Sequence, residues 1–146
     1  MEQIGELFTN KYLFTPLLVW LSIQIFKVVC DLIKTKKFDF KRILGAGGMP
    51  SSHSAVVMCL AMMVGKEAGF GSYIFALSFI FGIVVMYDAA GVRRAAGKQA
   101  VLLNKIINTP GLSSLQVQEK LVEVLGHTPV QVLVGAIIGI IVGLIV

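Results

Sequence analysis

Four apolar stretches dominate this chain and restrict it to an all-α membrane fold. They cover roughly residues 12–33, 53–64, 73–87 and 130–146. A helix needs about 20 apolar residues to cross the roughly 30 Å hydrocarbon core of a bilayer. The first and fourth stretches approach that length, whereas the second and third reach it only with the polar residues that flank them. Polar helix ends at such depth are tolerated only where they line a cavity enclosed by protein or filled with water.

Composition indicates the same class of protein. Hydrophobic residues make up 56% of the 146 residues and charged residues 14%, and the mean hydropathy is +0.85. A soluble domain is usually less apolar and carries about 25% charged residues. We therefore predict a single integral membrane domain over residues 1–146, a polytopic bundle of about four transmembrane helices plus one amphipathic interfacial helix. We expect no removable signal peptide, because no short apolar region precedes a small-residue cleavage site.

Loop charge predicts how the bundle is oriented. Residues 34–52 carry five basic side chains against one acidic side chain, and basic residues also follow the third stretch, whereas the link 65–72 is neutral overall. The positive-inside rule therefore places residues 34–52 and 88–129 in the cytoplasm and both termini outside. The net charge of +5 is then a topology signal and gives no reason to expect nucleic-acid binding.

Residues 112–125 predict the amphipathic helix, because apolar and polar residues interchange there after a Thr-Pro-Gly turn. The two cysteines, Cys30 and Cys59, both lie inside apolar stretches and are predicted to be small core residues. The spacing of cysteines and histidines matches no zinc motif, so we expect no metal and no other cofactor.

The run GGMPSSHSA, residues 47–55, is the strongest candidate for chemistry. It places Pro50 near an expected helix start, where unpaired N–H groups and the helix dipole favour anions. Ser51, Ser52 and the first-turn N–H groups would face that site, and His53 would titrate near neutral pH. The alternative, equally consistent with this run alone, is a serine-capped membrane helix with a glycine-rich approach.

The predicted topology brings two further polar clusters to the same side. One contains Asp88 with Arg93, Arg94 and Lys98, and the other contains His127 just before the last apolar stretch. Arginine matches phosphate oxygens in a bidentate geometry, and two histidines can divide the roles of nucleophile and general acid. Taken singly, such histidines are more often caps and such arginines topology signals. Their coincidence indicates a phosphate site.

These residues resemble the divergent branch of the type-2 phosphatidic acid phosphatase (PAP2) superfamily, which includes vanadium-dependent haloperoxidases. GGMPSSHSA is similar to that branch's version of the PSGH motif, and the blocks DAAGVRRAAGKQAVLLNKI and GHTPVQVLVGAIIG are similar to its other two. The resemblance implies an all-helical membrane fold and metal-independent attack on phosphate monoesters. It makes His127 the nucleophile that forms a phosphohistidine and His53 the general acid, with Ser51 and Ser52 holding phosphate oxygens.

Three features depart from the superfamily pattern. Leu121 stands where an arginine precedes the nucleophile by six residues, so Arg93 and Arg94 would have to supply that charge. Gln131 stands where an acid would orient the imidazole, and its amide can accept the same hydrogen bond without bringing charge. Slower turnover is therefore expected. The superfamily's first motif, a lysine and an Arg-Pro pair, is not recognisable, and Lys27 is the candidate replacement.

Two features of the apolar stretches have alternative interpretations. Lys27 is an intramembrane charge and so a functional candidate, or else it pairs with Asp31 one turn later and reaches toward the cytoplasm. Gly135, Gly139 and Gly143 form a small-residue face that suits close helix packing. Packing within the chain is favoured over a homodimer seam.

We therefore predict a phosphatase of a bacterial-type plasma membrane that hydrolyses a lipid phosphate or diphosphate at the cytoplasmic face. The alternative is a non-catalytic lipid-phosphate binding or transport protein, which Gln131 favours, whereas the histidine pair favours the enzyme. The expected partners are the lipid and the membrane. The predicted site residues are His127, His53 and Gln131 for catalysis, and Ser51, Ser52, Arg93, Arg94, Lys27 and Lys98 for binding.

Overall fold

The computed structural model describes residues 2–36, 48–107, 121 and 126–146. All regular secondary structure in these residues is helical. The helices are α1 (Glu2–Thr9), α2 (Lys11–Thr35), α4 (Ser52–Ala68), α5 (Tyr73–Ala90), α6 (Val92–Ile107) and α7 (Pro129–Ile145). The predicted all-α class is confirmed, and the four apolar stretches correspond to α2, α4, α5 and α7.

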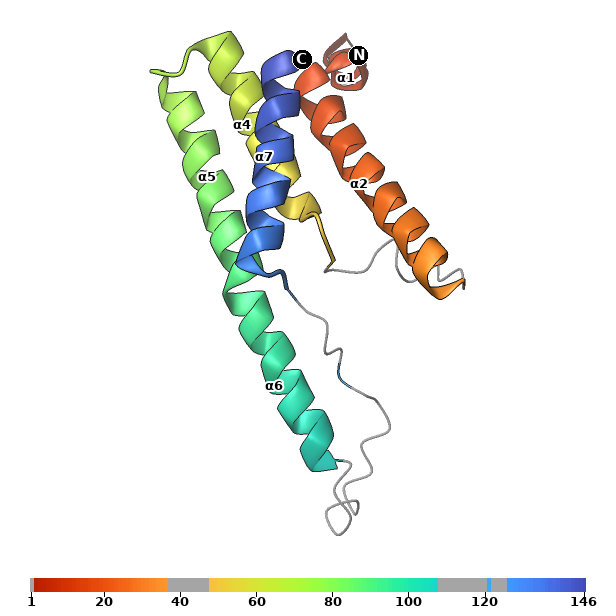
Figure 1. Ribbon diagram of the computed structural model, residues 1–146. Helices are drawn as coiled ribbons and strands as arrows, with labels where there is room; N and C mark the ends of the chain where they lie inside the picture. The colour runs from red at the N-terminus through yellow and green to blue at the C-terminus, as the bar shows by residue number, and fades with distance from the viewer. Residues whose placement is uncertain (1, 37–47, 108–120, 122–125) are drawn as a thin grey trace.

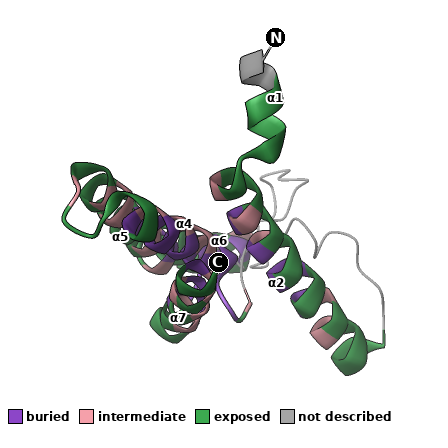
Figure 2. Ribbon diagram, turned by 90° about the horizontal axis from the view of Figure 1, so that it is seen from above, coloured by how far each residue is buried: buried purple, intermediate pink, exposed green. Residues whose placement is uncertain are grey.

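Helix α4 is the centre of the bundle. It packs against α7, α5 and α2, whereas α2 and α7 have almost no direct contact with one another. Figure 1 shows that α2, α4, α5 and α7 alternate in direction, so that both chain termini lie at one end of the bundle. The starts of α4 and α7 lie at the opposite end, as the predicted topology requires. Figure 2, seen along the bundle, shows α2 set apart from α7.

Glycines allow α7 to lie directly on α4. A Cβ on any of Gly135, Gly139 and Gly143 would press against a backbone carbonyl oxygen of α4. Small residues at such a face let two helix backbones approach closely, which is a common way of packing helices in membranes. The glycine face is therefore used within the chain.

Side-chain caps determine where the bundle helices begin. Each of these helices starts after a residue whose side-chain oxygen accepts a backbone N–H of the first turn, which satisfies one of the unpaired donors there. These N-cap residues are Asn10, Ser51, Ser72 and Thr128. The caps of α4 and α7 lie within two residues of a histidine, so they fix the position of each histidine relative to its helix.

The bundle has the surface of a membrane protein. Two helical stretches, Lys11–Thr35 and Tyr73–Ile107, are long and apolar enough to cross a bilayer, and α7 is a shorter apolar helix. Large apolar side chains on α2 and α5 are exposed, including Leu18, Phe26, Leu77 and Phe81. A contiguous apolar surface of this kind is unusual for a soluble monomer and is what lipid would cover. The number of four spans stays a prediction.

Two helices were missed in the sequence, and one predicted element lies elsewhere. Residues 92–107 form α6, although we expected loop over 88–129, and α1 precedes the first apolar stretch. Helix α6 is rich in alanine, leucine, lysine and arginine, which are strong helix formers, so its composition could have revealed it. The amphipathic helix predicted over residues 112–125 falls outside the described residues, apart from Leu121.

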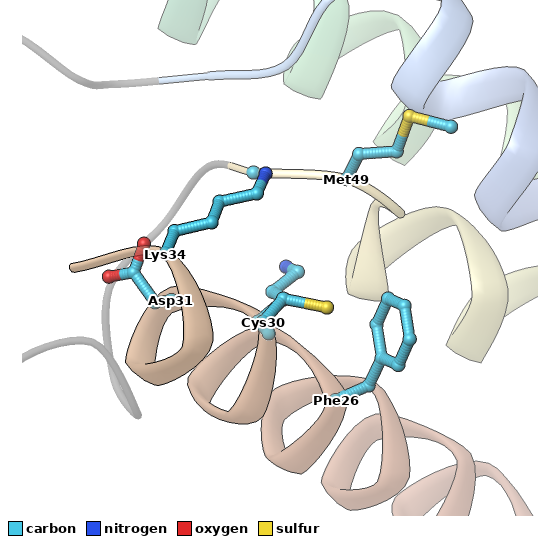
Figure 3. A pocket seen from close by; sticks show the side chains of 7 residues that line it. Phe26, Cys30, Asp31, Lys34 and Met49 are labelled. Atoms are coloured by element: carbon cyan, nitrogen blue, oxygen red, sulfur yellow. The ribbon is translucent and has the colours of Figure 1, made fainter. Parts of the chain in front are cut away.

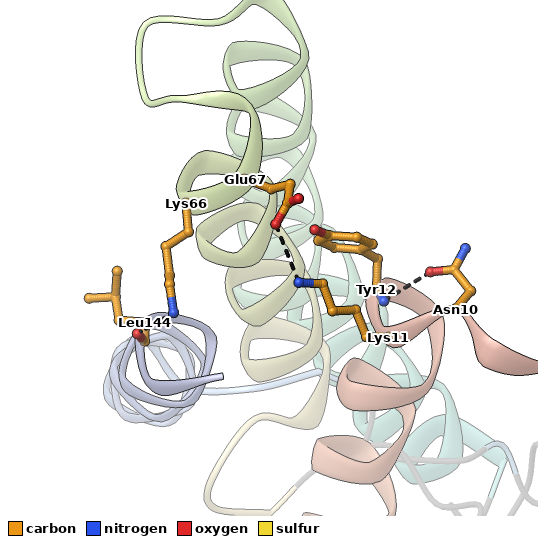
Figure 4. A network of polar contacts seen from close by, with 6 residues as sticks. All are labelled: Asn10, Lys11, Tyr12, Lys66, Glu67 and Leu144. Atoms are coloured by element: carbon orange, nitrogen blue, oxygen red, sulfur yellow. Dashed lines mark hydrogen bonds and ion pairs between the residues drawn. The ribbon is translucent and has the colours of Figure 1, made fainter.

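Polar contacts hold the helix ends together at the terminal end of the bundle (Figure 4). Lys11 Nζ lies 3.3 Å from Glu67 Oε2 and connects α2 to α4. Lys66 Nζ donates to the carbonyl oxygen of Leu144 at 2.8 Å and connects α4 to α7. These groups are exposed to solvent, so they fix the register of the helices more than they add stability.

Candidate active site

The two histidines meet at the end of the bundle opposite the termini. The ring centroids of His53 and His127 are 5.7 Å apart, and the rings are inclined by 64°. His53 lies in the first turn of α4, and His127 precedes α7 by two residues. Because α4 and α7 start at the same end and pack closely, their start positions bring the rings together. The convergence predicted from the topology is present.

The backbone around His127 is anchored to the junction of α5 and α6. The His127 N–H donates to the carbonyl oxygen of Ala89 at 2.9 Å. Gly126 has a φ of +90° and lies against the peptide that joins Arg93 and Arg94, so a Cβ there would collide with backbone atoms. Only glycine meets both conditions without strain. The backbone at Gly126 and His127 is therefore held by the hydrogen bond to Ala89 and by the contact with the Arg93–Arg94 peptide.

Gln131 connects the start of α7 to His127. Its side-chain Oε1 accepts the Thr128 N–H at 3.0 Å, and its N–H donates to Thr128 Oγ1 at 3.3 Å, which together form a capping box. The same Oε1 lies 3.4 Å from His127 Nδ1. This is a long contact, but it is the hydrogen bond that we expected the amide to accept. A proton on Nδ1 leaves Nε2 with a free lone pair.

Two buried ring nitrogens lack a well-formed hydrogen bond, although the Gly48 backbone lies near the His127 ring. His127 Nε2 and His53 Nδ1 have no hydrogen-bond partner in the part of the chain that the structure describes. Burial, together with the charges of Lys27 and His53, lowers the pKa of His127 below its usual range, and the contacts with Gln131 and the Gly48 backbone oppose that shift. His127 is therefore neutral at neutral pH. Leaving such atoms unpaired is costly, so they point to a ligand or a reacting group.

Ser51 proves to be a cap, as in the alternative interpretation of its motif. It is fully buried, its N–H donates to the Gln131 carbonyl oxygen at 3.0 Å, and its Oγ accepts from the N–H and the hydroxyl of Ser54. The backbone N–H groups of Ser52 and His53 have no partner among the described residues. The anion-binding end of α4 is thus open at these two positions.

Lys27 reaches the histidines from α2. Only 8% of its surface is exposed, and its charge acts on both His53 and His127. A buried ammonium near two imidazoles is costly unless an anion accompanies it. The intramembrane lysine singled out in the sequence is therefore placed at the site and does not extend to the surface.

The basic residues of α6 are not equivalent. Arg93 Nε donates to Asp88 Oδ2 at 2.7 Å, and the charges of both residues act on His53. Arg94 contributes backbone to the Gly126 contact. Its side chain is exposed, as is that of Lys98, and neither makes a contact with the histidines within the described residues. Of the three predicted α6 cations, the structure brings only Arg93 to the pair.

A cavity of about 330 Å³ adjoins the histidine pair at Lys27 (Figure 3). Cys30 lines it, which corrects the prediction that this cysteine is a core residue, whereas Cys59 is buried as expected. From the sequence, Asp31 is expected only as an ion-pair partner of Lys27 and Lys34 is not expected in the cavity wall, although both follow Lys27 at helical spacing on α2. The lining residues are Phe26, Lys27, Cys30, Asp31, Lys34, Gly48 and Met49.

Comparison with known proteins covers nearly the whole chain. The family described as the divergent PAP2 family matches residues 8–142, a range that contains both histidines. The chain is also 39% identical over 151 positions to a Bacillus subtilis (strain 168) protein named "Uncharacterized membrane protein YuiD", with 96% of each chain covered. No solved structure matches it. With its three sequence blocks inside the matched range, this chain belongs to the divergent PAP2 family.

Proposed function

We propose that this protein is a phosphatase of a bacterial-type plasma membrane that hydrolyses a lipid phosphate or diphosphate at the cytoplasmic face. The observation that carries the proposal is the buried pair of His53 and His127, whose unpartnered ring nitrogens lie beside Lys27 and the start of α4. Membership of the divergent PAP2 family supports the same chemistry.

In the first step, neutral His127 attacks the phosphorus atom through Nε2. The bond between phosphorus and the leaving oxygen breaks, its electron pair goes to that oxygen, and His53 supplies the proton, which it would carry when the negatively charged phosphate is bound. Gln131 holds the proton on His127 Nδ1, so the attacking nitrogen keeps its lone pair. The products of this step are the free lipid alcohol, or the lipid monophosphate from a diphosphate, and a phosphohistidine.

In the second step, water replaces the histidine. His53, now neutral, takes a proton from the water that attacks phosphorus, and the P–N bond breaks with its electron pair returning to His127. Inorganic phosphate leaves, and both imidazoles regain their starting protonation. Lys27, Arg93 and the free N–H groups of Ser52 and His53 would offset the charge that develops on the phosphoryl oxygens.

The second candidate is a non-catalytic protein that binds or carries a lipid phosphate. One observation favours it: residue 131 is an amide, so no carboxylate stabilises the positive charge of a phosphorylated imidazole. The same pocket residues would hold the phosphate in either case. The difference between the two proposals lies in turnover and not in binding.

The deciding experiment measures phosphate release by the purified protein in lipid nanodiscs, with long-chain alkyl phosphates and diphosphates as substrates. We expect release by the native chain, none by His127→Ala, and an acid-labile, base-stable phosphoprotein trapped in His53→Ala. For para-nitrophenyl phosphate, His53→Ala should keep part of its activity because nitrophenolate needs no proton. Full activity in His127→Ala would eliminate the mechanism, and tight binding without release would establish the carrier.

A further inference from the structure

An apolar groove runs between α2 and α7 and adjoins the charged cavity. Its volume is about 340 Å³, and its lining is almost wholly apolar. The groove shares Phe26 and Met49 with the cavity that contains Lys27, and Figure 3 shows both side chains at the edge of that cavity. The groove residues are Ser22, Ile23, Phe26, Met49, Pro50, Val134 and Ile138.

The groove follows from how the helices pack. Helices α2 and α7 both pack on α4 but barely touch one another, so a gap lies between them (Figure 2). The glycine face of α7 is turned toward α4, which leaves Val134 and Ile138, one turn apart, on the wall of the gap. Met49 and Pro50, which lead into α4, complete the lining.

The two cavities lie next to each other with Phe26 and Met49 in the walls of both, so the pair has a charged end and an apolar end. Lys27, Asp31 and Lys34 line the charged end, and the apolar end lies between two helices with exposed, lipid-facing surfaces. A free phosphate ion would use only the charged end. An amphiphile with an anionic head and a hydrocarbon chain matches both ends, because burying each CH₂ group of the chain is favourable.

We propose that this groove is the tail subsite for a single-chain segment of the lipid phosphate, which enters from the bilayer between α2 and α7. The head group would lie at Lys27 and the histidines, and Phe26 and Met49 would contact the junction of head and chain. This inference rests on the proposed function for the identity of the head group. It adds which helices admit the lipid and which residues select for a chain.

The test compares hexadecyl phosphate with butyl phosphate as substrates of Val134→Trp, which fills the groove. We expect the ratio of kcat/KM for hexadecyl over butyl phosphate to fall at least about tenfold relative to the native chain, since several methylene contacts are lost. Leu133→Trp is the matched control, because Leu133 is exposed on the neighbouring face of α7. It should leave the ratio unchanged. Should Val134→Trp fail to fold, Ser22→Phe tests the opposite wall.

A second measurement tests where the lipid chain binds without relying on catalytic turnover. Hexadecyl phosphate with a diazirine near the chain end is photo-crosslinked to the His127→Ala protein in nanodiscs. We expect labelled peptides from α2 and α7 at Ser22, Ile23, Val134 or Ile138, with or without catalysis in the native chain. An unchanged chain-length ratio in a folded Val134→Trp, or labelling confined to α5, would overturn the tail subsite. Labelling at the groove without phosphate release would instead refute only the phosphatase.

Discussion

Charged and titratable groups are exposed at one end of the helical bundle, and some are buried at the other. At the terminal end, Lys11 and Glu67 form an exposed ion pair and Lys66 donates to a backbone carbonyl group, so each charge has a partner and remains in contact with water. At the other end, Lys27 and His127 are buried, and a ring nitrogen of His127 has no partner among the described residues. The first arrangement keeps its charges in water, whereas the second buries its titratable groups and leaves a ring nitrogen of His127 without a well-formed hydrogen bond.

Buried groups without a well-formed hydrogen bond indicate where function lies in a membrane bundle. Exposed pairs hold helix ends in register and contribute little free energy, so substitutions there should be tolerated. Buried unsatisfied groups lower stability and persist in a fold only when they do something else, such as binding an anion. Each prediction below tests whether the histidine end has the properties of a reactive site that the terminal end lacks.

The largest effect is expected for His127→Ala. Removing the nucleophile should lower kcat by about 10⁴ or more, as for the loss of a nucleophile in other covalent enzymes. Glu67→Gln, which breaks the ion pair at the terminal end, should change kcat less than about twofold, since exposed pairs are weak. Phosphate release from hexadecyl phosphate measures both. Similar losses in the two variants would show that the ends do not differ in role.

Gln131→Glu should make the histidine end more reactive. A carboxylate beside His127 Nδ1 stabilises positive charge on the ring, and glutamate serves the capping box as well as glutamine does, so α7 should still start at Pro129. We expect kcat to rise by a factor on the order of 10–10³, given about 1.4 kcal/mol per pKa unit. Vanadate affinity should stay within about threefold.

Gln131→Met is the control variant. It removes both the contact with the His127 ring and the capping box, so it should slow the reaction. The argument about charge fails if the native chain turns over rapidly and Gln131→Glu does not change the rate. In that case the amide alone would orient the imidazole well enough.

Gly126→Ala should damage the site, whereas Gly69→Ala should not. Both glycines have positive φ, but a Cβ at Gly126 would collide with the Arg93–Arg94 backbone and one at Gly69 would meet nothing within 4 Å. Alanine at a positive φ is strained at either position, by on the order of 1–3 kcal/mol. At Gly126 the collision should also displace His127, and a displacement of about 1 Å can lower kcat about 10²-fold. Thermal unfolding and kcat separate the two costs.

The sequence predicted which residues meet at the histidine end, but not the backbone contacts that hold them there. The direction of the four apolar helices follows from apolar length and loop charge, so the meeting of His53, His127 and Lys27 at one end could be anticipated. The contact of Gly126 with α6 could not, because it joins backbones that are far apart in sequence and depends on where α6 lies. The serine cap is one of two interpretations of the GGMPSSHSA run, and the burial of Ser51 with its hydrogen bonds to Ser54 decides between them.

The groove between α2 and α7 could not be predicted from the hydropathy pattern either. Cys30 and Phe26 belong to a uniformly apolar stretch, and hydropathy alone assigns them to a core or to lipid. They line cavities because α2 packs on α4 and not on α7. Close contacts such as those of the α7 glycines set the relative placement of the helices. The glycine spacing in the sequence predicts that α7 has a close neighbour but does not say which helix that neighbour is.

Lys27→Met should shift the pH dependence of the reaction. The reactive His127 is the neutral form, so kcat/KM falls on the acid side as the ring is protonated. Burial and then Lys27 hold the His127 pKa below its usual range, and His53, Gln131 and the Gly48 backbone also face the ring. Removing the lysine leaves burial in place but raises that pKa, so the acid limb should move to higher pH, with about tenfold weaker substrate binding.

Lys34→Met is the control for this shift. Lys34 lines the same cavity, but Lys27 and His53 are the charged or titratable groups that act on His127. The acid limb of its profile should therefore stay where the native one lies. An identical limb in the Lys27→Met profile would show that Lys27 acts only on the phosphate and not on the nucleophile.

The smallest effect separates two neighbouring arginines. Arg93 is paired with Asp88 and its charge acts on His53, whereas the Arg94 side chain is exposed and has no contact with the histidines among the described residues. Because the Arg93–Asp88 pair is itself about half exposed, Arg93→Ala should weaken vanadate binding only about fivefold, near the lower limit for a charged hydrogen bond. Arg94→Ala should weaken it less than about twofold, and Asp88→Asn should strengthen it slightly by freeing Arg93. Calorimetric titration with vanadate measures all three variants. Equal losses in the two arginine variants would mean that both guanidinium groups reach the bound anion.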